Sequence, residues 1–101
     1  MAEAVSVGEI VTKLRSEADD SGDVWFAIAA DVTNNTQDPV EIRLKLQAVD
    51  SDGFELTDLA LRGVLRPGET KRLSDQDYMP HKNYLAIARW QIDSLSVYEP
   101  E

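Results

Sequence analysis

Few residues of this 101-residue chain could support catalysis. The one histidine, His81, lies in a Pro80-His81-Lys82 segment typical of a solvated loop. General acid–base catalysis needs groups held at a set distance, and no spacing among the 19 acidic residues nominates a pair. Nucleophile-elbow, phosphate-loop and paired-histidine zinc motifs do not occur. We therefore predict that the protein is not an enzyme, and that it has no catalytic residues and no cofactor.

Aspartates gather in two short segments and raise the alternative of a calcium site. Their positions are Asp19, Asp20, Asp23, Asp50 and Asp52. The second segment begins like an EF-hand loop, but the twelfth position, which needs a bidentate glutamate, is Leu61. Both segments also have the composition of tight turns. We predict no metal site, and keep a small-ligand or calcium-binding domain that uses these acidic loops as the alternative function.

A basic cluster is the strongest candidate for partner binding. Four of the ten basic residues flank a Pro-Gly turn, namely Arg62, Arg66, Lys71 and Arg72. On an acidic chain this hairpin would form a positive tip able to pair with carboxylates of a partner. The other interpretation, which we favour, is that the charges protect a sheet edge from unwanted pairing. Consecutive residues of a regular strand point to opposite faces, so Lys71 and Arg72 cannot both serve one flat site.

The tripeptide Asn34-Asn35-Thr36 matches the pattern of an N-glycosylation acceptor. It stands between two alternating segments, where a turn is expected. We interpret it as a turn in which asparagine adopts a positive φ.

Composition narrows the classes of partner. The formal net charge of −9 repels a phosphate backbone and an anionic membrane surface, so we predict no nucleic-acid binding and no membrane insertion. No stretch approaches the ~20 apolar residues of a membrane span. The absence of cysteine excludes disulfides and thiolate metal sites. We expect a monomer whose partner is another protein or domain.

The elements that would position these residues are strands. Apolar and polar residues alternate from Val40 to Ala48 and from Val24 to Asn34, the period of a half-buried strand. Turn formers recur at Ser51–Gly53 and at Pro67-Gly68, with glycine where a positive φ is needed. These intervals predict one domain over 1–101, an all-β antiparallel sandwich of about six to seven strands. The expected core contains Phe26, Ile28, Val32, Leu44, Leu46, Ile87 and Trp90.

Two strands change phase, which predicts β-bulges. In the first strand, about Val5 to Arg15, the change falls at Gly8. In a later strand containing Leu85 and Ile92, it falls across Ala88-Arg89. Leu95 to Tyr98 either ends that strand or forms a short last one. Helix is hard to place, and the one candidate is a turn around 74–78.

The order of turns resembles that of bacterial FxLYD-type immunoglobulin-like domains. The motifs are Val32-Thr33-Asn34-Asn35-Thr36, a strand that runs into Val49-Asp50-Ser51-Asp52-Gly53, and Leu65-Arg66-Pro67-Gly68-Glu69-Thr70. The namesake string is largely absent, because this chain reads Leu46-Gln47-Ala48-Val49-Asp50 there. Trp25 and Tyr84 also resemble the core tryptophan and the tyrosine corner of such sandwiches. The resemblance implies an immunoglobulin-like accessory or adhesion-like module with no catalytic residues.

The function expected from these observations is that of a noncatalytic interaction or structural module of a bacterial envelope or multidomain protein. An accessory domain of an enzyme is a third interpretation. The expected location is the cell envelope or the exterior for an excised domain, and the cytoplasm for a full-length chain.

Overall fold

Six long strands and one short helix follow one another along the described part of the chain. The computed structural model describes residues 4–17 and 22–100. The elements are β1 (Val5–Leu14), β2 (Asp23–Asn34), β3 (Val40–Val49), β4 (Glu55–Leu65), β5 (Thr70–Pro80), α1 (His81–Ala86) and β6 (Arg89–Tyr98). No described helix is long and apolar enough to cross a membrane.

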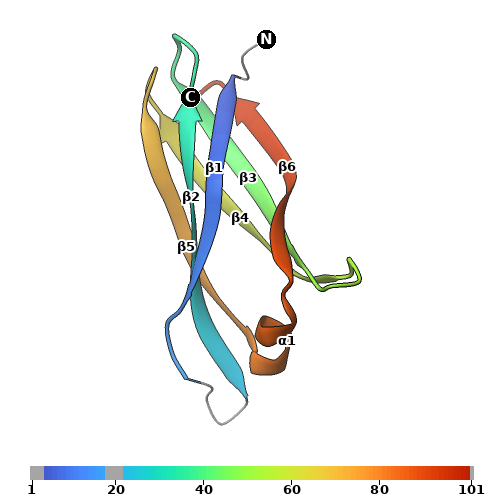
Figure 1. Cartoon of the computed structure of the whole chain (residues 1–101). Helices are drawn as coiled ribbons and strands as arrows, with labels where there is room; N and C mark the ends of the chain where they lie inside the picture. The colour runs from blue at the N-terminus through green and yellow to red at the C-terminus, as the bar shows by residue number, and fades with distance from the viewer. Residues whose placement is uncertain (1–3, 18–21, 101) are drawn as a thin grey trace.

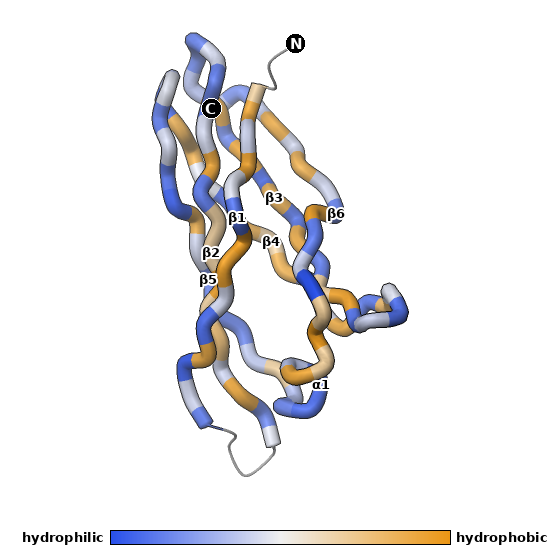
Figure 2. Tube along the Cα trace, in the orientation of Figure 1, coloured by the Kyte–Doolittle hydropathy of each residue, from blue (hydrophilic) through white to orange (hydrophobic). Residues whose placement is uncertain are grey.

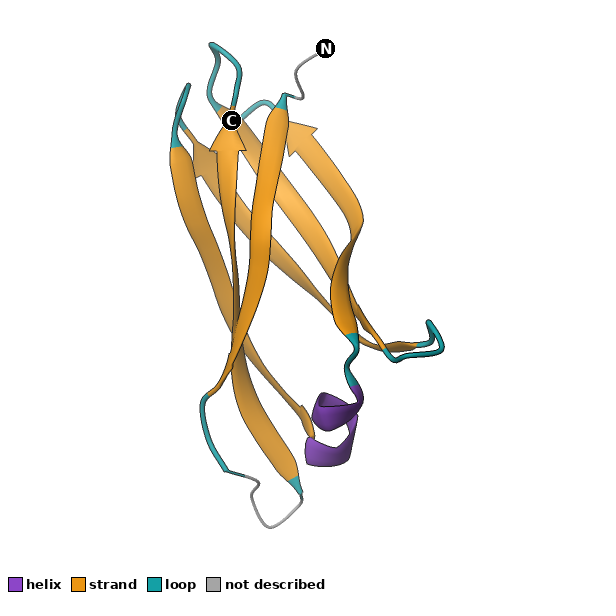
Figure 3. Ribbon diagram, in the orientation of Figure 1, coloured by secondary structure: helices purple, strands orange, loops and turns teal. Residues whose placement is uncertain are grey.

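The strands form two three-stranded antiparallel sheets that pack face to face. One sheet has the order β1-β2-β5 and the other β4-β3-β6, so β2 and β3 are the central strands (Figures 1 and 3). The turn between β4 and β5 joins the two sheets along one side of the molecule. This arrangement confirms the all-β class predicted from the alternation of residues.

The core lies between β2 and β3, as their alternation predicts. Every second residue of each strand is buried, and the buried faces of both sheets form one apolar cluster. Burying such faces removes apolar surface from water, which is the main favourable term in folding. The predicted core residues Phe26, Ile28, Val32, Leu44 and Leu46 are fully buried, while Ile87 and Trp90 are half-buried against them.

Turn chemistry also agrees with the sequence. Gly53 and Gly68 have φ values of +87° and +74°, a region where a side chain is strained. The Asp50 carboxylate accepts hydrogen bonds from the backbone N–H groups of Asp52 and Phe54, at 2.9 and 3.0 Å. Asp50, one of the clustered aspartates of this segment, therefore stabilises the turn through its side chain.

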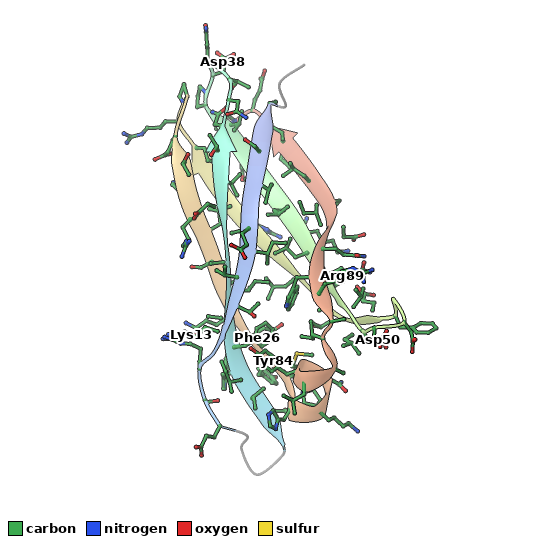
Figure 4. The ribbon with its side chains drawn as sticks, viewed as in Figure 1. Lys13, Phe26, Asp38, Asp50, Tyr84 and Arg89 are labelled. Carbon is green, nitrogen blue, oxygen red and sulfur yellow. The ribbon has the colours of Figure 1, made fainter. Side chains whose placement is uncertain are left out.

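The prediction was wrong for the segment that precedes β6. Residues 74–78, the one candidate for a helical turn, belong to β5, and residues 81–86 form α1 where a loop followed by a strand from Leu85 was expected. Tyr84 of α1 packs on Phe26 with ring centroids 5.6 Å apart, so the helix closes the end of the core (Figure 4). This long-range contact is invisible to local periodicity, because Tyr84 and Phe26 lie on different elements.

Trp25 is not the core tryptophan that the resemblance to immunoglobulin-like sandwiches implied. Trp25 is 45% exposed on the outer face of β2, where it stacks against Tyr78. Trp90 of β6 is the tryptophan that packs on the core, against Phe26.

Candidate interaction edge

One side of the molecule presents two strand edges without a described neighbour. β6 pairs only with β3, and β1 pairs only with β2, among the residues that the structure describes. In Figure 1 these two strands diverge on the side away from the β4–β5 turn. About half of the backbone N–H and C=O groups of such an edge point outward and can pair with another strand.

The register places the apolar side chains of β6 on its inner face. Val97 lies opposite Ile42, Leu95 opposite Leu44, and Ile92 opposite Leu46. The three partners on β3 are at most 1% exposed. Ile92 and Val97 are nevertheless 47% and 42% exposed, because β1 does not cover them. The inner face of β6 is therefore apolar and only partly covered.

An apolar hollow of about 460 Å³ separates the two edges. It is lined by Ala4, Val5, Val7, Ile92, Leu95 and Val97. Figure 2 shows hydrophobic stretches on both β1 and β6. A second hollow, of about 290 Å³, is lined by residues that include Thr12, Tyr84 and Trp90, near α1. The gap between the sheet edges thus continues beyond the first hollow toward the helix end.

A bulge divides β6 at its middle. Lys45 lies opposite Ser94 and Leu46 opposite Ile92, so Asp93 has no partner of its own on β3. The Lys45 ammonium lies 3.8 Å from the carboxylates of both Asp93 and Asp58. The negative charge that the bulge places beside the edge is therefore paired with a cation of β3.

Sequence reasoning missed this edge because it placed the phase change of the strand too early. The signal is present in the chain. Trp90 and Ile92 are even-numbered, whereas Leu95 and Val97 are odd-numbered. Read as one strand with its bulge at Asp93, the segment has a continuous apolar face.

The structure does not bring the four predicted basic residues into one surface. Arg62 lies on β4 opposite Arg43 of β3, and Arg66 lies at the start of the β4–β5 turn. Lys71 and Arg72 lie on opposite faces of β5, as expected. Lys71 donates to the backbone carbonyl of Val64 at 2.8 Å, across to the edge strand of the other sheet. The ammonium of Lys71, which also lies 4.0 Å from the carboxylate of Glu69, is therefore engaged within the chain.

Arg72 has a partner on its own sheet. Its Nε lies 2.8 Å from Oδ1 of Asp31, the residue opposite it on β2. The hydrogen bond from Arg72 lowers the pKa of Asp31 below its ordinary value of 3.8, and the charge of Arg72 adds to this effect. The guanidinium of Arg72 is therefore engaged within the chain.

The remaining candidates take structural positions. The backbone N–H of His81 donates to the carbonyl of Gly22 at 2.8 Å, where α1 begins. The described residues contain no group of three histidine, cysteine or acidic side chains arranged to hold a metal ion. Asp19 and Asp20, which belong to the calcium alternative, lie outside the described residues.

Asn34, the first residue of the glycosylation pattern, is fully buried. Its amide nitrogen donates to the carbonyl of Asp38 at 2.8 Å and to that of Arg66 at 3.2 Å. Its amide oxygen accepts from Thr36 N and Oγ1. The expected turn is present, but a positive φ is not its cause, because no described residue other than glycine has one.

Comparisons with known proteins bear on the fold alone. The chain is similar to the X-ray structure of Northeast Structural Genomics Consortium target SoR45, with a TM-score of 0.56 and 8% sequence identity. The match covers 96% of this chain and 87% of that chain. No protein-family model matches the sequence, and no curated protein matches it.

Proposed function

We propose that this protein is a noncatalytic interaction module that binds an extended segment of another polypeptide along β6. The added segment would continue the β4-β3-β6 sheet, and its alternate side chains would enter the hollow beside β1. The observation that carries this proposal is the partial exposure of Ile92 and Val97 next to an unpaired strand edge. Strand addition of this kind takes affinity from main-chain hydrogen bonds and specificity from alternate side-chain pockets.

The strand order supports an immunoglobulin-like version of this fold. In such sandwiches the strands A, B and E lie in one sheet, and C, F and G lie in the other. β1, β2 and β5 correspond to A, B and E, while β3 and β6 correspond to C and F. The outer edge of β6 is then the position that strand G takes. The proposed relation to bacterial FxLYD-type domains rests on the turn motifs of the sequence.

The chemistry of the edge also favours a polypeptide over other partners. The hollow is lined by aliphatic side chains, which suit apolar side chains of a strand. The net charge of −9 disfavours nucleic acid and anionic lipid. Edge strands of β-sheets are often blocked by proline, by inward-pointing charge or by a β-bulge. The inner face of β6 carries neither proline nor charge, and its bulge at Asp93 interrupts the alternation at one position only.

A photoreactive residue placed at Val97 tests the proposal. Expressed in its native cell, this variant should cross-link to a polypeptide whose labelled site, mapped by mass spectrometry, lies in an extended segment. Val64 is the matched control, because it is also a half-exposed valine (47%) on an edge strand but faces outward from β4. Adding the substitution Ile92→Lys should abolish the cross-link from Val97. The same products from both positions, or no product from Val97, would contradict the proposal.

A further inference from the structure

In β6 the order of inward-facing and outward-facing residues is the same from the N-terminal end of the strand as from its C-terminal end. Trp90, Ile92, Leu95 and Val97 face inward; Arg89, Gln91, Ser96 and Tyr98 lie on the outer face. The bulge at Asp93 is the reason, since it shifts the alternation by one residue at the middle of the strand. The pattern is therefore symmetric about the point between Asp93 and Ser94.

This symmetry has a consequence for pairing between two copies. In an antiparallel pair, residues directly opposite one another lie on the same face of the sheet. Two copies of a regular strand can pair with matching faces in many registers. Two copies of a strand with a central phase change match along their whole length in only one register. In that register Trp90 lies opposite Val97 of the second copy, and Ile92 lies opposite Leu95.

We propose that the extended segment that binds β6 is β6 of a second copy of this chain. This proposal rests on the proposed function, since it uses the same edge and hollow. The two copies would form one continuous six-stranded sheet with the order β4-β3-β6-β6-β3-β4. The expectation from the sequence is a monomer, and the symmetric pattern of β6 is the reason to propose a dimer.

Charge complementarity favours the same register. Arg89 stands at one end of β6, and Glu99 follows its other end. Neither makes an ion pair among the described residues, so antiparallel pairing would place each Arg89 near Glu99 of the second copy. Arg89 would also lie opposite the Tyr98 ring of that copy, within reach of a cation–π contact. At the centre, Lys45 already compensates Asp93.

The expected dimer is weak and depends on concentration. A single strand ladder is smaller than a standard interface of about 800 Å² per partner, and smaller interfaces belong to transient complexes. Two chains of charge −9 also repel each other at low ionic strength. Sedimentation should therefore show a dimer that forms at high protein concentration and is strengthened by salt.

Cysteine cross-linking tests the register, because the chain has no cysteine of its own. The double variant Gln91→Cys with Ser96→Cys places two thiols directly opposite one another in the proposed dimer. Within one chain these positions are roughly 16 Å apart, at about 3.3 Å per residue, too far for a disulfide. Mild oxidation should convert this variant to a covalent dimer. The controls are the single variants Gln91→Cys and Ser96→Cys, in which each thiol lies roughly 16 Å from its equivalent in the second copy, so that both should stay largely uncross-linked.

The outcomes separate this proposal from the proposed function. Ile92→Lys should abolish the dimer, while Val64→Lys, at an equally exposed site on β4, should not; the melting temperature of each variant checks its fold. A chain that stays monomeric at high concentration, or equal cross-linking of the double variant and the single cysteine variants, would overturn the self-pairing. If Val97 still cross-links to another protein in that case, the proposed function stands and only the second copy is wrong as its partner.

Discussion

Phe26 and Trp90 join the two sheets at one point of the core, with ring centroids 5.9 Å apart and planes inclined at 41°. Phe26 belongs to the central strand of one sheet, and Trp90 to the edge strand β6 of the other. Because Tyr84 of α1 also packs on Phe26, the beginning of β6 is held by aromatic contacts. The hollow lined by Ile92 and Val97 lies farther along the strand. The structure thus anchors one end of β6 and leaves the inner face of its other part uncovered.

The two tryptophans should differ in their contribution to stability. We expect Trp90→Ala to lower the free energy of unfolding by about 2–3 kcal/mol, somewhat less than the ~3–5 kcal/mol for a fully buried aromatic residue. Trp25→Ala is the control, because its ring stacks on Tyr78 at the outer surface, and it should cost about 1 kcal/mol. Urea denaturation monitored by circular dichroism measures both. Equal costs would mean that Trp90 does not pack on the core.

Asn34 should be among the most sensitive polar positions. Asn34→Ala removes the buried donor for the carbonyls of Asp38 and Arg66, and the acceptor for Thr36. Each buried group left without a partner costs about 1–3 kcal/mol, so we expect a total loss of about 2–4 kcal/mol. Asn35→Ala, at the exposed neighbouring position, should cost under about 1 kcal/mol. Chemical denaturation of both variants gives the comparison, and a small loss for Asn34→Ala would show that the loops do not depend on this side chain.

Gly63 of β4 provides space for Leu73, which reaches across from β5. A Cβ atom added at Gly63 would lie 2.5 Å from Cδ2 of Leu73, which is 5% exposed. We therefore expect Gly63→Ala to destabilise the fold by about 1–3 kcal/mol, the range for overpacking. In combination with Leu73→Ala the penalty should shrink, because the new methyl group enters the space that the leucine leaves. A double-mutant cycle measures this coupling, and simple additivity would argue against the contact.

The Asp31–Arg72 pair should make stability depend on acid pH. Its hydrogen bond lowers the pKa of Asp31 in the folded state, so the folded chain binds fewer protons than the unfolded chain in this range. The stabilisation by this pair is complete when the pH is above the pKa of Asp31 in the unfolded chain. It is lost as the pH falls through the lower pKa of Asp31 in the folded chain. Arg72→Gln should therefore lower the melting temperature slightly at neutral pH and not at all in strong acid.

The control for this prediction is Arg62→Gln. Arg62 makes no ion pair within the described part of the chain, and its removal should give no such pH dependence. Thermal melts of the three proteins across the acid range provide the test. A difference between wild type and Arg72→Gln that persists unchanged into strong acid would exclude the ion pair as its cause.

The local features of the fold were predictable from the sequence. The alternation in β2 and β3 identified the buried residues of both central strands, because side chains of a strand alternate between two faces whatever lies beyond them. The glycines at positions 53 and 68 identified two turns, because few other residues tolerate a positive φ. The opposite directions of Lys71 and Arg72 followed from the same geometry.

Features that depend on which strands meet were decided by the tertiary structure alone. Local pattern could not place α1, which packs through Tyr84 on a residue of β2. It could not tell that Trp90 packs on the core while Trp25 stays at the surface, or that Arg72 pairs with Asp31, 41 positions away along the chain. The candidate edge belongs to this class as well. An apolar alternation predicts a strand, but whether its inner face is covered depends on the strand opposite it, and here β1 leaves the inner face of β6 partly open.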